Sequence, residues 1–93
     1  MILTFGDTTQ PGAVAAKIAI ARARTVVFRN NCANTIYWGW EPTTNAKLDG
    51  NPQVGVRLKT DEWVVIDGKD MLATNIYFAS AAGGNVIEYT LNT

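Results

Sequence analysis

The chain has 93 residues and a mass of 10.1 kDa, with eight basic and eight acidic side chains and no histidine. One domain is expected, because compact domains commonly have about 100 to 150 residues. The balanced charge disfavours binding to nucleic acid or to an anionic membrane. A hydrophobic fraction of 47% beside 17% charged residues is high for so small a body, so we expect part of the apolar surface to lie between subunits.

Cys32 is the only cysteine, so no intrachain disulfide can form, and the absence of histidine removes the commonest general base and transition-metal ligand. We therefore predict no enzyme, no cofactor and no metal site. A glycosidase-like pair of carboxylates is a remote alternative, because most acidic residues fall in turns, where solvated acids are expected whatever the function. Residues 1–7 lack the features of a signal peptide, and nowhere do 18 apolar residues follow one another. A soluble protein made in the cytoplasm is expected.

Residues 1–12 are expected to form an N-terminal arm or strand, and residues 13–93 a β-sandwich domain. Residues 1–5 suit a short strand, and Pro11 with Gly12 predicts a turn after it. Residues 13–23 allow two interpretations, since their alanines favour a helix while Ile18 and Ile20 alternate with alanines as in a strand. No cap or wide apolar stripe supports the helix, so the strand is preferred.

Residues 24–40 predict a β-hairpin. Val26 and Phe28 share one face of a first strand-like run, and Ile36, Trp38 and Trp40 share one face of a second. Between the runs, residues 30–34 are rich in asparagine, which tolerates left-handed backbone and bonds to its own main chain. The chain is therefore expected to reverse there.

The rest of the chain predicts a long surface loop and two further hairpins. Residues 41–52 are polar and rich in turn formers, which indicates the loop. Residues 54–58 and 62–67 read as one hairpin, and residues 75–80 and 85–91 as another. With roughly 6 to 8 short strands, the chain is expected to be all-β, a single antiparallel β-sandwich or small barrel of jelly-roll-like form.

Aromatic and apolar residues outside the expected core suggest an interface. Trp63 begins an unbroken apolar run, which predicts a strand covered on both faces, with the second cover supplied by a neighbouring subunit. Trp38 is expected in the core, whereas Trp40 lies at a strand end beside the long loop, where an interface and core packing are about equally expected. The predicted interface residues are Met1, Leu3, Phe5, Tyr37, Trp40, Trp63 and Val65.

Alternating β patterns and turns follow one another in a set order from residue 24 onward. The segments concerned are residues 26–31, 33–34, 36–39, 42–44, 56–59, 62–67, 75–84 and 86–89. In this order the chain resembles small β-structured virion proteins of tailed bacteriophages, over about seventy residues. It departs from that pattern at Asp61, where a Pro-Gly turn is usual, and in residues 1–23.

The resemblance implies a non-enzymatic virion component, such as a capsid decoration or cement protein or an accessory part of the tail. Its implied partners are the major capsid protein or other virion proteins, together with further copies of itself. Repetition on a shell favours a homotrimer or another closed assembly, and residues 1–5 would suit strand addition to a neighbour. The alternative is a tail or fibre module that binds host glycans, with Trp40 and Tyr37 stacking on sugar rings.

Overall fold

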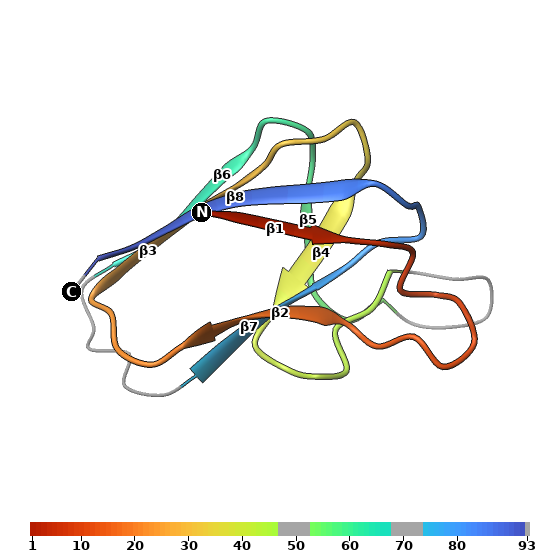
Figure 1. Cartoon of the computed structure of the whole chain (residues 1–93), viewed down its shortest axis with the longest axis horizontal. Coiled ribbons are helices and arrows are strands. Elements are labelled where there is room, and N and C mark those ends of the chain that lie inside the picture. Colours follow the sequence, from red (N-terminus) through yellow and green to blue (C-terminus); the bar gives the residue numbers. More distant parts are fainter. Residues whose placement is uncertain (47–52, 68–73, 93) are drawn as a thin grey trace.

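The computed structural model describes residues 1–46, 53–67 and 74–92. These residues form eight strands and no helix, so the all-β prediction is confirmed (Figure 1). The strands are β1 (Ile2–Phe5), β2 (Ala16–Ile20), β3 (Thr25–Asn30), β4 (Ile36–Gly39), β5 (Val56–Leu58), β6 (Trp63–Ile66), β7 (Thr74–Ala79) and β8 (Asn85–Asn92). The strand interpretation of residues 13–23 is confirmed by β2. Of the predicted loop at 41–52, residues 47–52 lie outside the described residues.

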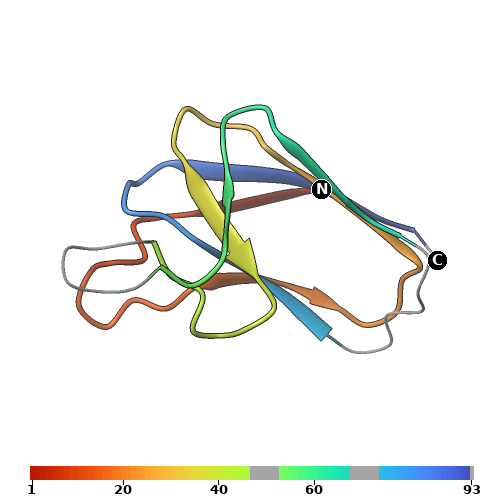
Figure 2. The same cartoon turned by 180° about the vertical axis from the view of Figure 1, so that it is seen from behind.

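The eight strands form two four-stranded antiparallel sheets. Sheet A has the order β1-β8-β3-β6, and sheet B has the order β2-β7-β4-β5. The pairs β1 with β8, β2 with β7, β3 with β6 and β4 with β5 are nested inside one another. This is the topology of a jelly roll, an eight-stranded sandwich. Figures 1 and 2 show two open layers, so the predicted sandwich is confirmed and the barrel alternative is not.

All three predicted hairpins are wrong, because each pair of strands is split between the two sheets. β3 and β4 lie in different sheets, as do β5 and β6, and β7 and β8. A corner that crosses from one sheet to the other needs the same residues as a hairpin turn, namely polar residues or residues that tolerate a left-handed backbone conformation. Asp61, with φ 65°, is such a residue in the corner between β5 and β6. Among the described strands, β4 and β5 alone are neighbours both in sequence and in a sheet.

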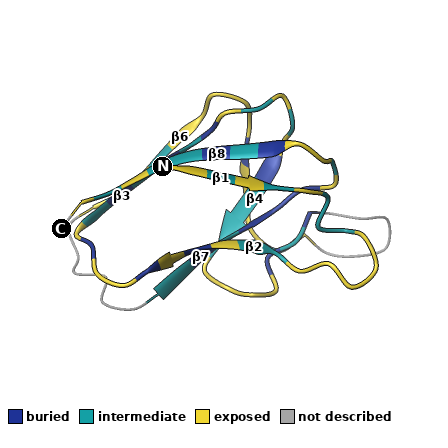
Figure 3. Cartoon of the chain, viewed as in Figure 1, coloured by how far each residue is buried: buried dark blue, intermediate teal, exposed yellow. Residues whose placement is uncertain are grey.

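The core lies between the sheets and takes the inward residues of both. Phe28 is at its centre, with its ring edge-to-face against Trp38 at 5.1 Å and Phe78 at 5.2 Å between centroids. The core position predicted for Trp38 is thus confirmed. Inward and outward residues alternate along β3 and β8, as the burial colours of Figure 3 show. The buried residues that pack together in this core are Ile18, Ile20, Ala23, Val26, Phe28, Ile36, Leu58, Ile76, Phe78 and Ile87.

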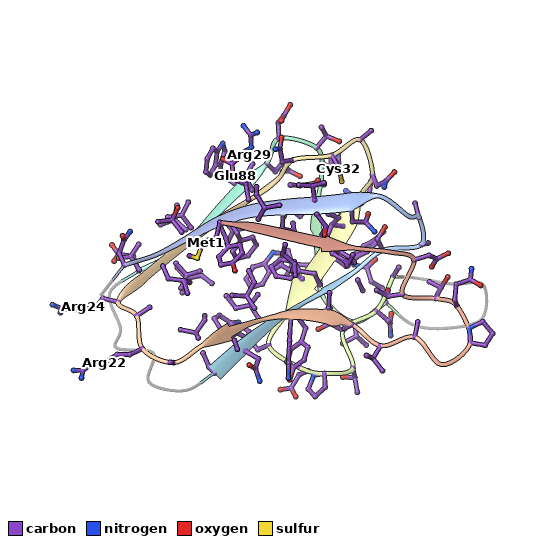
Figure 4. The ribbon with its side chains drawn as sticks, in the orientation of Figure 1. Met1, Arg22, Arg24, Arg29, Cys32 and Glu88 are labelled. Carbon is purple, nitrogen blue, oxygen red and sulfur yellow. The ribbon has the colours of Figure 1, made fainter. Side chains whose placement is uncertain are left out.

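The corner after β3 is held by a buried asparagine. Nδ2 of Asn30 donates to the carbonyl oxygens of Asn34 at 2.7 Å and Leu58 at 2.9 Å. Its Oδ1 accepts from the backbone N–H of Cys32 at 3.1 Å. Cys32 lies in this corner (Figure 4), half-buried against the core with its Sγ also 3.1 Å from Oδ1 of Asn30. Its position is that of a small packing residue.

Candidate interaction surface

The outward face of β6 carries two large apolar side chains that are more than half exposed. Val64 and Ile66 point inward and pack against the core. Trp63 and Val65 alternate with them and are 56% and 62% exposed. The core covers one face of this apolar run, and no described residue of the chain buries the other (Figure 3). Both residues belong to the predicted interface.

Arg29 and Glu88 lie beside Trp63 on the same outward face of sheet A. Arg29 is opposite Trp63 on one side and opposite Glu88 on the other. Its guanidinium carbon is 5.3 Å from the centroid of the Trp63 ring, a cation–π arrangement, and its Nη2 donates to Oδ1 of Asn31 at 2.6 Å. The Arg29 Nη2 to Glu88 Oε2 distance is 3.9 Å, a loose ion pair at the surface (Figure 4). A surface pair of this kind contributes little to folding.

A second apolar feature is a pocket of about 240 Å³ at the end of β4. Trp40 is 44% exposed, and its ring meets that of Trp38 edge-to-face at 6.0 Å between centroids. Val56, on the neighbouring edge strand β5, is 57% exposed. The pocket is lined by these residues together with Gly39, Glu41, Thr44, Val54 and Gly55. Its walls are mainly indole and aliphatic, with few polar groups.

Residue Thr44, from the loop after β4, forms one wall of this pocket by packing onto two glycines. Thr44 is buried, and its hydroxyl donates to the carbonyl oxygen of Glu41 at 2.7 Å. A Cβ on Gly39 would lie 2.8 Å from the Thr44 Oγ1, and a Cβ on Gly55 would lie 2.9 Å from the Trp38 carbonyl oxygen. Gly55 also has φ 127°, a conformation that favours glycine. Glycine at these two positions lets the loop close over β4 and β5.

The N-terminal strand β1 is an edge strand of sheet A rather than a free arm in this structure. Leu3 and Phe5 point inward and pack against the core, whereas Met1 and Ile2 are exposed. The Met1 ammonium donates to the carbonyl oxygen of Tyr89 at 2.9 Å, which holds the start of the chain against β8 (Figure 4). Strand alternation allows only one of Leu3 and Ile2 to face outward, and the outward residue is Ile2 rather than the predicted Leu3.

Tyr37 and Trp40 do not lie together. They are three residues apart on an extended segment, so their side chains point to opposite faces. Tyr37 lines a separate hollow of about 250 Å³ with Asn34, Thr35, Ala46, Ser80, Ala81 and Ala82. A glycan site that stacks one sugar on both aromatic rings is therefore excluded by the geometry. The exposed Val56 is a further surface residue that the sequence pattern did not single out.

Comparison with protein-family models, with curated proteins and with solved structures gives no match for this chain. In the part of the chain that the structure describes, no helix is long and apolar enough to cross a membrane. Within the same ranges, no three acidic or cysteine side chains are arranged to hold a metal ion. The function therefore has to be argued from the two apolar surfaces, the outward face of sheet A and the pocket beside Trp40.

Proposed function

We propose that this chain is a non-enzymatic structural protein of a bacteriophage virion, a capsid decoration or cement protein that acts through protein–protein contacts. The observation that carries the proposal is the exposure of Trp40, Trp63 and Val65 on an otherwise well-packed sandwich. Tryptophan is enriched at the energetic centres of protein interfaces. Large apolar side chains grouped on a small soluble domain are typical of binding surfaces.

The two apolar surfaces suit two different contacts. The outward face of sheet A is an open sheet face and suits burial against a sibling subunit. The Trp40 pocket lies beside the loop that follows β4, and we assign it to the shell, where it would receive an apolar side chain of the major capsid protein. Virion assembly in the host cytoplasm would bring these partners together. The resemblance implies a homotrimer, whereas the order of side chains across sheet A favours a two-fold dimer as the sibling contact.

The mechanism would be stabilisation by preferential binding. A protein that binds across the joints of an assembled lattice, and less well to free capsid subunits, shifts the equilibrium toward the assembled state. The gain grows with the ratio of free protein to its dissociation constant. Many weak contacts repeated over a shell would then act together without any catalytic step.

The test is co-sedimentation of the purified protein with capsids of the phage that encodes it. Trp40→Ser removes the aromatic wall of the pocket and is expected to weaken shell binding at least about tenfold. Val14→Ser is the matched control, because Val14 is 80% exposed, belongs to the segment between β1 and β2 and does not line the pocket. A wild-type protein that does not sediment with capsids, or two variants that lose binding equally, would contradict the proposal.

A glycan-binding module of a tail or fibre is the second candidate, and one observation favours it. The hollow beside Tyr37 combines an aromatic ring with the hydroxyl of the exposed Thr35, groups that suit a sugar. Binding to a glycan array that disappears in Tyr37→Ala and persists in Trp40→Ser would support this function. No binding to any glycan by the wild type would exclude it.

A further inference from the structure

One row of side chains across the outward face of sheet A has a symmetric pattern. The register places Ile2 opposite Glu88, Glu88 opposite Arg29, and Arg29 opposite Trp63. The row therefore reads apolar, negative, positive, apolar from one edge of the sheet to the other. Glu88 and Arg29 are the only charged residues among the outward positions of the four strands in this sheet.

This pattern is self-complementary under a two-fold axis. The axis runs parallel to the strands, between β3 and β8, and it lies in the plane where the sheet A faces of two copies meet. Rotation by half a turn lays Arg29 on Glu88 of the second copy and lays Trp63 on Ile2 of the second copy. We propose that the outward face of sheet A binds a second copy of this chain in this two-fold arrangement.

The next row along the strands fits the same axis at its two central positions. The register places Val27 between Val65 and Thr90, so rotation lays Val27 on Thr90 of the second copy. No like charges meet in any row, because the face holds one acid and one base. A C2 interface requires a surface patch that complements itself, and this face meets that requirement.

The conformations of the two charged residues also suit the contact. Arg29 is held along the face by its hydrogen bond to Asn31 and by the Trp63 ring, so little side-chain freedom remains to be lost on binding. The Glu88 side chain is 42% exposed, and its bond from Asn31 Nδ2 is long at 3.5 Å. Its carboxylate can accept stronger hydrogen bonds from the guanidinium of a second copy.

The size of the face sets the expected strength. Four strands about 4.8 Å apart, with about 20 Å of strand length, give a flat face of roughly 400 Å² per copy. This area leaves out the additional surface of the protruding side chains. Two such faces together bury roughly 800 Å², less than the about 1,200 Å² of the smallest stable interfaces, so we expect a weak dimer that dissociates at micromolar concentrations or above. The chain's zero net charge adds no long-range repulsion between copies.

This inference rests on the proposed function only in treating the sheet A face as a sibling contact. Shell binding through the Trp40 pocket can succeed or fail separately, because that pocket is formed by other residues. Sedimentation equilibrium in the absence of capsids therefore tests the pairing alone. The wild type is expected to change from monomer to dimer as its concentration rises about a hundredfold through the dissociation constant.

Two charge reversals give the decisive measurement. Arg29→Glu leaves two acids on the face and Glu88→Arg leaves two bases, so each variant alone is expected to pair at least about a hundredfold more weakly. An equal mixture of the two is expected to form a mixed dimer, since every acid then meets a base across the axis. An ion pair within one chain cannot produce this recovery. Lys17→Glu, which replaces a base by an acid at an exposed position of β2 in sheet B, is the matched control and should dimerise as the wild type does.

Trp63→Thr is a second variant in case a charge reversal prevents folding, because threonine suits a strand and Trp63 is outward and exposed. It is expected to weaken dimerisation at least about tenfold with little loss of secondary structure. A wild type that is monomeric at all concentrations, or one that forms a trimer, would overturn the two-fold pairing. So would dimerisation that survives both charge reversals, which would point to pairing through a strand edge.

Discussion

Asn34 donates a hydrogen bond from its Nδ2 to Oδ1 of Asn85 over 3.1 Å, which joins two sheet-crossing corners 51 residues apart in sequence. Nδ2 of Asn85 in turn donates to the carbonyl oxygens of Ala82 at 2.7 Å and Phe5 at 3.1 Å. With Asn30 bonded to Leu58, these side chains tie together all four corners at one end of the sandwich. Buried amides in this arrangement satisfy backbone carbonyls that no strand partner reaches.

Asn85→Ala is expected to lower the free energy of unfolding by about 2 to 3 kcal/mol, because buried carbonyl groups and the Asn34 amide lose their partners. Asn85 is 1% exposed, so water cannot replace these bonds without a change in packing. Urea denaturation followed by tryptophan fluorescence would measure the loss. Asn92→Ala, at an exposed position near the end of the same strand, is the control and should change stability by less than about 0.5 kcal/mol. Equal effects of the two would contradict the role given to Asn85.

Two glycines with positive φ are expected to respond differently to alanine. Gly84 has φ 72°, and no atom lies within 4 Å of the place that an alanine Cβ would take, so Gly84→Ala should cost about 1 kcal/mol from backbone strain alone. Gly55→Ala adds a Cβ only 2.9 Å from the Trp38 carbonyl oxygen, so it should cost distinctly more, about 2 to 4 kcal/mol. Thermal unfolding of both variants would compare them. A Gly55→Ala variant as stable as Gly84→Ala would mean that the Thr44 loop is not packed as described.

Phe28 is expected to be the most sensitive aromatic position. Phe28→Ala removes both edge-to-face contacts at the centre of the core, and a loss of about 3 to 5 kcal/mol is expected, enough to unfold much of a small domain. Trp63→Ala, which removes a larger but exposed ring, should cost less than about 1 kcal/mol in the monomer. Circular dichroism at low protein concentration would separate the two. A severe loss in Trp63→Ala would indicate that its ring is needed for folding as well as for binding.

The stability of the chain should fall at acid pH, with a contribution from Asp7. Hydrogen bonds from the Thr9 side chain, then from Gln10 and the Thr9 backbone, lower the pKa of Asp7 below its ordinary value of 3.8. Because the folded pKa is the lower one, this stabilisation is present above the ordinary pKa and is lost as the pH falls through the folded pKa. NMR titration of the Asp7 carboxyl carbon would show the lowered midpoint. Thr9→Ala should move that midpoint back upward, and an unchanged midpoint would contradict the assignment.

The alternation of apolar and polar residues along the chain was enough to predict the strands and their inward faces. It did not predict which strands pair with one another. Val86, Glu88 and Thr90 face outward as their period-two pattern predicts, and β2 forms despite its alanines. The same pattern carries no information on which sheet a strand joins. Asn30 shows why, since a residue suited to an exposed turn is equally suited to a buried corner where its amide bonds to two carbonyl groups.

The candidate surfaces were partly predictable for a related reason. Trp63 and Val65 stand out because an apolar run on both faces of a strand exceeds what one core can bury. The separation of Tyr37 from Trp40 follows from the alternation of side chains between the two faces of a strand. The pocket does not, because it depends on Thr44 packing onto Gly39 and Gly55, contacts between residues that no periodic pattern connects.

The nested pairing of the strands means that neither half of the chain can fold without the other. Residues 1–46 supply two strands to each sheet, and residues 53–92 supply the other two, in alternation. A cut between these halves would produce two fragments in which every strand has its hydrogen-bonding partners on the other fragment. Such fragments are candidates for complementation, in which mixing the two unfolded peptides restores one folded domain. Folding of the mixture would then show that the two peptides have associated.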